Sequence, residues 1–401
     1  MKQRNTKHEK RLKKLVLTCL LLAVFLTVGT YAWFIGMQTV SVDAFEVKIA
    51  TVEDLALSLD GSSWSTDLTV TEEALEANEY AKGTYSWTAL KPVSTIGAIS
   101  TETSKLIMFD KGSLTATDGG YRLMSALVKN KATTSDSAGE EDGYVAFDLF
   151  IKNMSGDAYY SDITDPSNEE AIYLDTESSV TADDAGNTAS GIENSVRIAF
   201  AQIGRVRSDA KVDLIRSISC ATAEGITPIC NDRLATIYEP NDTDHVANAI
   251  NWFSKTCKKR GTDGSYTDQQ CELIADGTAY PTYAVSGEIG HTAAVDVYDG
   301  LNGYRGSLSN VAAANKLVEV NTFTDTEKMY TETARPEFFY LAPNSITKVR
   351  VYVYLEGQDV DNYDFASLGH SITAKFGFTK ERFTGDEILV DEEDGTEEGQ
   401  S

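Results

Sequence analysis

An uncharged apolar run of 23 residues, Leu15–Met37, is the feature that most constrains this chain. It is long enough to cross a bilayer as a helix. Seven basic residues and one acidic residue precede it, and a positive flank stays on the cytoplasmic side of a membrane. The sequence therefore predicts a cytoplasmic basic flank over residues 1–14 and a membrane-spanning helix or signal peptide over residues 15–37. The rest of the chain is then exported and attached to the membrane through residues 15–37.

Part of the same run also has the length of a signal-peptide core. Leu15–Val28 is followed by the small residues Gly29, Thr30 and Ala32, where a signal peptidase can cut. If the run is retained, the protein is tethered at the cell surface. If it is removed, the segment that follows becomes a free N-terminus. The residues by themselves leave these two alternatives open.

The exported part of the chain is strongly acidic. The chain has 35 basic and 61 acidic residues, of which seven basic and one acidic lie before residue 15, so the remainder carries a net charge of −32. Such a surface repels nucleic acid and anionic lipid head groups. We therefore expect an extracellular or cell-surface protein without a nucleic-acid partner.

Four of the five cysteines lie close together on the exported part: Cys220, Cys230, Cys257 and Cys271. An even, clustered set of cysteines on an exported chain predicts disulfides. Three pairings exist, and we expect neighbours to pair, Cys220 with Cys230 and Cys257 with Cys271. No Cys-x-x-Cys spacing occurs, which disfavours a zinc site. Cys19, the fifth, lies in the apolar run and acts as an apolar filler.

Alternation of apolar and polar residues predicts an all-β fold. In the segment Lys348–Gly357, Val349, Val351, Val353 and Leu355 form one face, and Arg350, Tyr352, Tyr354 and Glu356 form the other. Similar patterns occur at Val40–Val47, Tyr144–Asn153, Ser195–Gly204 and Ser371–Phe378. Two sheets packed face to face would bury the apolar faces. The sequence therefore predicts a β-sandwich over residues 38–383.

Two segments have helical patterns instead. Asp244–Cys257 places apolar residues at helical spacing among the four cysteines, and Thr69–Asn78 is a second, shorter helix. We interpret residues 207–340 as a disulfide-pinned, partly helical insertion between two core strands. The final segment, residues 384–401, is acidic and is expected to be a disordered tail.

The motifs of the common hydrolases are missing from the sequence. It contains no His-Glu-x-x-His, no Gly-x-Ser-x-Gly and no P-loop. The exported histidines, His245, His291 and His370, are scattered, and paired carboxylates cannot be told apart from a solvated acidic surface. We expect no catalytic residues and no enzymatic activity, and a surface hydrolase is the least favoured alternative.

Calcium is the one cofactor that the residues suggest, and otherwise we expect none. Residues 162–170, 239–244 and 356–364 each offer several oxygen ligands, although none has the EF-hand spacing. Asp and Asn are also ordinary turn formers, which is the alternative interpretation. The candidate ligands in the third segment are Glu356, Asp359, Asp361 and Asp364.

The N-terminal stretch resembles a known group of proteins. "VGTYAWF" (Val28–Phe34), followed by a short polar segment and "VDAFEVKI" (Val42–Ile49), is similar to the N-terminus of TasA/camelysin-type proteins. Gram-positive bacteria export these proteins, and a signal peptidase of the SipW type processes them. The segment "VRVYVYLEGQDVDN" (Val349–Asn362) is similar to their late strand. The resemblance implies a SipW-type peptidase as partner and a cut between Ala32 and Trp33.

The best-known members of this group have a jelly-roll β-sandwich and polymerise into biofilm-matrix fibres. A freed N-terminal strand completes the sheet of the neighbouring subunit by donor-strand exchange. The resemblance thus implies a jelly-roll-like fold and self-assembly, or assembly with other matrix proteins. Gln38–Ala50 is the candidate donor strand. The alternative is that this segment forms the first strand of its own sandwich.

These observations predict a non-enzymatic structural protein of the cell surface or biofilm matrix that polymerises through its N-terminal strand. The alternative is a membrane-anchored adhesin or ligand-binding module that presents the insertion of residues 207–340.

Overall fold

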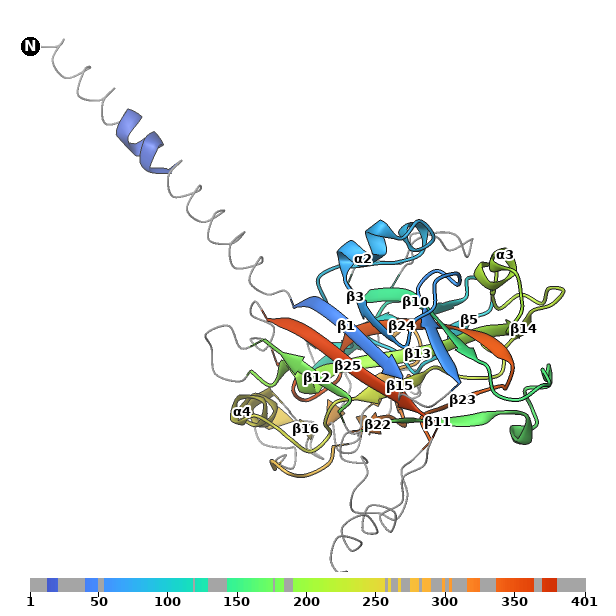
Figure 1. The fold of residues 1–401 in the computed structure, drawn as a ribbon. Helices are drawn as coiled ribbons and strands as arrows, with labels where there is room; N and C mark the ends of the chain where they lie inside the picture. Colours follow the sequence, from blue (N-terminus) through green and yellow to red (C-terminus); the bar gives the residue numbers. More distant parts are fainter. Residues whose placement is uncertain are drawn as a thin grey trace, which may run out of the picture.

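The computed structural model describes residues 13–20, 40–49, 54–117, 120–128, 143–175, 177–183, 190–256, 259–260, 266–267, 275–280, 283–289, 298–299, 303–304, 316–324, 337–363 and 370–380. This part of the chain is mainly β, which confirms the all-β part of the predicted fold class. Two large sheets form the body of the protein (Figure 1).

The first sheet contains both the earliest and the latest strands of the sandwich. Its order is β23–β11–β25–β1–β3, and β12 also pairs with β25. The bounds are Ser41–Ile49 for β1, Asp67–Val70 for β3, Glu170–Leu174 for β11, Ser179–Ala182 for β12, Phe339–Leu341 for β23 and Ser371–Thr379 for β25. Strands β1 and β25 run parallel, although more than 300 residues separate them in the sequence.

The second sheet is built on three long antiparallel strands, β10 (Val145–Asn153), β24 (Ser345–Glu356) and β13 (Val196–Arg207). Its order is β2–β10–β24–β13–β15–β22, with β14 on β13 and with β4 joining β24 to β7. The bounds of these shorter strands are Leu55–Ser58 for β2, Thr236–Glu239 for β15, Phe323–Thr324 for β22, Thr227–Pro228 for β14, Pro92–Ser94 for β4 and Phe109–Asp110 for β7.

Short elements complete the described structure. Apart from the helical residues 13–20, the α-helices of the described residues are α2 (Glu72–Ala77), α3 (Val212–Arg216) and α4 (Ala247–Thr256), and the 3-10 helices are η1 (Ala81–Gly83), η2 (Pro166–Asn168) and η3 (Ile192–Ser195). Two-stranded pairs are formed by β5 (Ile99–Ser100) with β6 (Lys105–Leu106), β8 (Ser113–Thr117) with β9 (Gly120–Met124), β16 (Lys259–Arg260) with β17 (Tyr266–Thr267), β18 (Tyr283–Val285) with β21 (Leu317–Glu319), and β19 (Tyr298–Asp299) with β20 (Gly303–Tyr304).

Aromatic side chains fill the space between the two sheets. Phe45 of β1 packs edge-on against Phe147 of β10, with ring centroids 5.1 Å apart, and stacks on Phe376 of β25 at 5.5 Å. Phe200 of β13 contacts Phe376 from the opposite sheet. Such contacts add to the stabilisation that burial of the rings provides. The core therefore ties the N-terminal strand to both sheets.

The second sheet is covered on its outer face as well. The predicted apolar face of β24, Val349 to Leu355, belongs to the core between the sheets. On the other face, Tyr352 and Tyr354 pack in a second cluster with residues such as Leu106 and Ile215. Every residue of β24 is consequently buried. The alternation assigned the two faces correctly, but the polar face is not exposed to solvent.

Most of the predicted helices and strands agree with the structure. Strands β10, β13, β24 and β25 occupy the predicted segments, and α4 lies within the predicted helix Asp244–Cys257. The predicted helix Thr69–Asn78 is wrong at its start, because Thr69 and Val70 end β3 and α2 begins only after Thr71. The Cys220–Cys230 disulfide is present, with a Cα–Cα distance of 5.8 Å. Cys257 and Cys271 lie outside the described residues, as does the tail of residues 384–401. The segment of residues 207–340, which we interpreted as an insertion, contributes β14, β15 and β22 to the second sheet. Part of this segment is therefore part of the sandwich itself.

The predicted membrane segment is described only over residues 15–20, which form part of a helix, and residues 21–39 lie outside the described ranges. Among the residues that are described, no helix combines the length and the apolar character needed to cross a membrane.

Candidate functional site

Strand β1, the candidate donor, lies between β25 and β3 in the first sheet. Its parallel pairing with β25 extends from Ser41 to Ile49, with an irregularity between Val42 and Ala44 at which Asp43 has no partner in the register. On its other side, β3 pairs antiparallel with Phe45–Lys48. Alternate side chains of β1 are buried in the core. The segment thus forms the first strand of its own sandwich, which is one of the two alternatives that the sequence left open.

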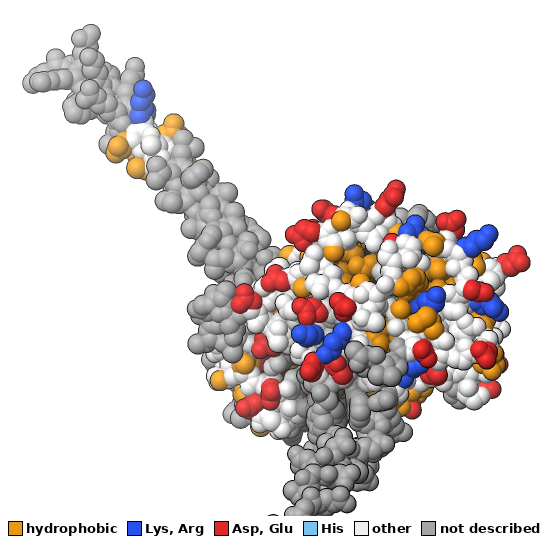
Figure 2. Space-filling model, in the orientation of Figure 1, with side chains coloured by type: hydrophobic (Ala, Val, Ile, Leu, Met, Phe, Trp, Pro, Cys, Tyr) orange, Lys and Arg blue, Asp and Glu red, His pale blue; other side chains and the backbone are white. Residues whose placement is uncertain are grey.

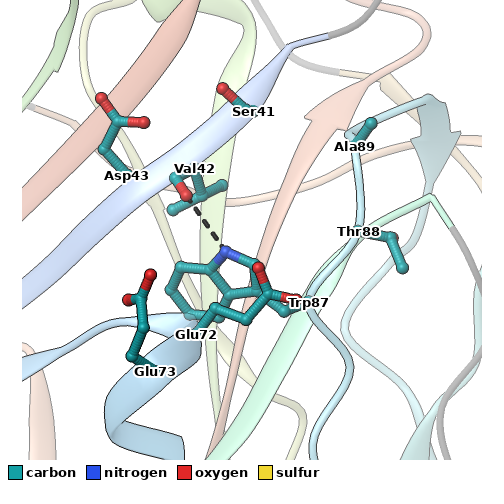
Figure 3. Close-up of a pocket in the computed structure, with 8 residues that line it drawn as sticks. All are labelled: Ser41, Val42, Asp43, Glu72, Glu73, Trp87, Thr88 and Ala89. Carbon is teal, nitrogen blue, oxygen red and sulfur yellow. Dashed lines mark hydrogen bonds between the residues drawn. The ribbon is translucent and has the colours of Figure 1, made fainter. Parts of the chain in front are cut away.

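Residues 86–91, which we call the strap, connect the beginning of β1 to the second sheet by hydrogen bonds. Ser86 exchanges two backbone hydrogen bonds of 2.9 Å with Ala146 of β10. At the other end of the strap, the Leu90 N–H donates to the carbonyl oxygen of Val40 at 2.7 Å. Between these points, the indole Nε1–H of Trp87 donates to the carbonyl oxygen of Val42 at 3.1 Å (Figure 3). The strap therefore bridges the two sheets at the N-terminal end of β1.

An open hollow of about 510 Å³ lies beside this strap. Trp87, Asp43 of β1 and the first-turn residues Glu72 and Glu73 of α2 contribute to its lining (Figure 3). Helix α2 begins here because the Thr71 hydroxyl oxygen accepts a hydrogen bond from the Ala74 N–H. The three carboxylates are exposed, whereas Trp87 is half-buried. The hollow is thus acidic at its rim and aromatic along one wall.

A buried charged cluster lies at the end of β24. Arg197 of β13 forms ion pairs with Glu239 of β15 and with Asp359 in the turn after β24. Glu356, the last residue of β24, is also buried, and burial raises the pKa of its carboxyl group to about 8. The single positive charge of Arg197 is therefore shared between two carboxylates, while the third, Glu356, is held neutral near pH 7.

His245 extends this cluster towards α4. Its Nδ1 atom lies 2.9 Å from Oδ2 of Asp361, and its Nε2 atom lies 3.1 Å from the carbonyl oxygen of Thr278. Burial lowers the pKa of His245, but the hydrogen bond and charge of Asp361 outweigh this effect, so the pKa is raised. Burial raises the pKa of Asp361 to about 6. Because Nε2 faces a backbone carbonyl, this contact is not that of a nucleophile–histidine pair.

The cluster shows where the candidate calcium ligands lie. Glu356, Asp359 and Asp361 come close together, but the last two are engaged by Arg197 and His245. Asp364 lies outside the described residues. In the described ranges, no group of three or more His, Cys, Asp or Glu side chains is arranged to hold a metal ion. Because a guanidinium sits against Glu239 and Asp359, it takes the place that a metal cation would need.

The other two candidate loops use their oxygens for turns and ion pairs. Asp162 accepts hydrogen bonds from the backbone and side chain of Thr164, which is an Asx turn. Glu169 forms ion pairs with Arg205 and Arg233. In the loop of residues 239–244, Glu239 pairs with Arg197. The turn-forming interpretation of these residues therefore accounts for their contacts.

A second buried ionic group lies on the outer face of β10 and β24. Asp148 accepts from Nε of Arg350 at 2.7 Å and lies 3.2 Å from Nζ of Lys348. The Tyr80 hydroxyl also donates to Asp148, at 2.8 Å. Burial by itself raises the pKa of Asp148, but the two cations outweigh it and hold that pKa well below its usual range. Sequence reasoning missed both ionic groups, although arginines within apolar strands were visible at Arg197 and Arg350.

The exposed surface bears out the acidic composition. Figure 2 shows Asp and Glu side chains scattered over the visible face, with Lys and Arg between them.

Comparisons of the chain with protein-family models, with curated proteins and with solved structures found no match. The resemblance to TasA/camelysin-type proteins therefore stays a prediction.

Proposed function

We propose that this chain is an exported, non-enzymatic structural protein of the cell surface or biofilm matrix, and that copies of it assemble by exchanging β1. The observation that supports the proposal best is the position of β1 in the first sheet and its backbone pairing there. Its two neighbours, β25 and β3, belong to the same chain, and the strand pairs with β25 along nearly its whole length and with β3 over Phe45–Lys48. An identical strand from another copy would make the same hydrogen bonds and bury the same side chains.

Exchange of an identical element is a low-cost route to assembly, because the contacts of the closed form are restored in the exchanged form. The position of β1 favours this route, since it is the first strand of the sandwich and the next strand begins six residues after its end. The buried ring of Phe45 would anchor the incoming strand in the core. The proposal includes the jelly-roll-like arrangement of the two sheets that the resemblance implies.

The proposal also includes processing by a SipW-type signal peptidase between Ala32 and Trp33. Cleavage there would leave eight residues ahead of Ser41, so β1 would become a free N-terminal strand. Retention of residues 15–37 would instead produce a tethered surface protein. The mass and N-terminal sequence of the protein from membrane and medium fractions of its native cells separate these two forms.

A pairwise cysteine experiment tests the exchange directly. Glu46 of β1 and Lys375 of β25 face each other in register, with 3.4 Å between Oε2 and Nζ. Facing positions on paired strands meet the distance that a disulfide requires. One preparation carries Glu46→Cys and the other carries Lys375→Cys, and the two are mixed under oxidising conditions. Exchange of β1 predicts a disulfide between the two proteins.

The matched control replaces Lys375→Cys by Glu337→Cys. Glu337 is exposed and lies beside β23, on the far side of β11 from β25. Cross-linking with Lys375→Cys but not with Glu337→Cys supports exchange, and electron microscopy should then show filaments. If the double variant Glu46→Cys/Lys375→Cys forms its disulfide within one chain while the mixture stays uncross-linked at high concentration, β1 does not exchange.

A further inference from the structure

The two halves of β1 are held by different partners on the side away from β25. Strand β3 pairs with the C-terminal half, Phe45–Lys48. The N-terminal half is held there by the strap, residues 86–91, whose Leu90 N–H and Trp87 indole N–H donate to the carbonyls of Val40 and Val42. The irregularity at Asp43 lies between these two halves, and a bulge locally interrupts the ladder. On this side, the N-terminal half of β1 is therefore held by hydrogen bonds to the strap, and its C-terminal half by pairing with β3.

We propose that the strap, residues 86–91, is a latch that holds the N-terminal half of β1, and that release of the Trp87 indole from the Val42 carbonyl opens residues 40–44 ahead of the rest of the strand. The inference deepens the proposed function by naming the contact that controls the exchange of β1. It rests on that function only for its consequence in assembly, since local opening of β1 is a property of the single chain.

Three features place the release at Trp87. The indole bond is made by a half-buried side chain, whereas the Leu90 bond is made by the backbone of a buried residue. The hollow beside Trp87 leaves about 510 Å³ into which the ring can turn away from the core against which it packs. The exposed carboxylates of Asp43 and of the α2 first turn line the same hollow, so it is open to solvent that can hydrate the indole N–H once it leaves the Val42 carbonyl.

Hydrogen exchange on the full chain in detergent micelles tests the latch. Trp87→Phe keeps an aromatic ring and deletes the donor. We expect the amides of residues 40–44 to exchange roughly 5- to 30-fold faster, the factor for a buried acceptor that loses its donor. The amides of residues 45–49 and of β24 should stay protected while residues 40–44 exchange, because they are exposed only in rarer and larger openings. The matched control is Trp64→Phe, because Trp64 contacts Lys152 rather than β1.

A second variant distinguishes loss of the indole hydrogen bond from a change in how the ring at position 87 packs. Replacement of Trp87 by the benzothiophene analogue of tryptophan keeps the ring shape and substitutes sulfur for the N–H group. The proposal predicts the same local acceleration in this variant as in Trp87→Phe. Unchanged exchange of residues 40–44 in both variants overturns the latch. Exchange of β24 at the same rate as residues 40–44 also overturns it, because the strand end would then open only together with the whole fold.

The cysteine mixture separates failure of the latch from failure of the proposed function. If exchange of β1 between copies occurs, Trp87→Phe should speed the Glu46→Cys/Lys375→Cys cross-link by the same factor as the local hydrogen exchange. Faster hydrogen exchange without any cross-link leaves the latch standing and rejects assembly by β1. If the cross-link forms at the same rate with Trp87 and with Trp87→Phe, and hydrogen exchange is unchanged, the latch is rejected. Assembly by exchange of β1 is then still supported.

Discussion

The Nδ1 atom of His245 lies 2.9 Å from Oδ2 of Asp361, and both side chains are 2% exposed. The opposite nitrogen, Nε2, faces the Thr278 carbonyl, which only accepts hydrogen bonds, so Nε2 carries a proton. A second proton is shared between Nδ1 and Asp361. The pair thus joins the segment before α4 to the turn after β24 through one titratable proton.

This pair predicts a pH-dependent contribution to stability. The pKa of His245 is raised, so its stabilisation is complete below the unfolded value near 6.5 and is lost as the pH rises through the folded value. We expect His245→Gln to cost roughly 3 kcal/mol at pH 6, because it breaks a buried pair, and clearly less at pH 9. Urea unfolding at the two pH values measures the difference.

His370→Gln is the control for that experiment. The Nδ1 atom of His370 contacts the backbone carbonyl of Asp183 at 3.1 Å, and this partner does not titrate. We expect the cost of His370→Gln to be much less dependent on pH. Equal costs of His245→Gln at pH 6 and pH 9 would show that the shared proton does not contribute.

Glu356 predicts that the protein loses stability between mildly acidic and mildly alkaline pH. Its folded pKa is about 8, above the ordinary value of 4.5, so the folded state binds a proton that the unfolded state has released in this range. Stability contributed by this group is therefore greatest below pH 4.5 and falls until about pH 8. Glu356→Gln should flatten the curve and stabilise the protein at pH 8 by on the order of 4 kcal/mol. Thermal unfolding from pH 5 to pH 9 is the measurement, and a variant with the wild-type slope would contradict the assignment.

The Asp148–Arg350 pair predicts a strongly non-additive mutant cycle. Arg350→Met removes the guanidinium from a buried carboxylate that Lys348 and Tyr80 still contact, and should cost about 3–5 kcal/mol at pH 7. Asp148→Asn combined with Arg350→Met should cost less than the sum of the two single changes, because neither partner is then left as an uncompensated charge. Additive costs in guanidinium unfolding would mean that the two groups act independently.

The disulfide predicts a moderate loss of stability when it is removed. Cys220 and Cys230 are ten residues apart and both are buried in the cluster on the outer face of the second sheet. The double change Cys220→Ala/Cys230→Ala should lower the free energy of unfolding by about 3 kcal/mol in the chain-entropy model. The variant avoids the ambiguity of chemical reduction, which would also reach Cys257 and Cys271. An unchanged melting temperature would show that the bond adds no stability.

The local features of the fold can be predicted from the amino-acid sequence. Alternation in Lys348–Gly357 identified β24 and both of its faces, and helical spacing located α2 and α4. The Cys220–Cys230 pairing was also predictable, because few residues separate the two cysteines. These features depend on neighbours along the chain, and periodicity reports directly which face of an element a side chain occupies.

The segments that cover each face of a strand are known only from the three-dimensional structure. The sequence placed Arg350 and Glu356 on the polar side of β24, but did not show that Leu106, Ile215 and their neighbours cover that side. It did not pair Arg197 with Asp359, which is 162 residues away, or seat β1 beside β25. Periodicity carries no information about which distant segment supplies the cover, because pairing across the chain depends on the packing of the whole sandwich.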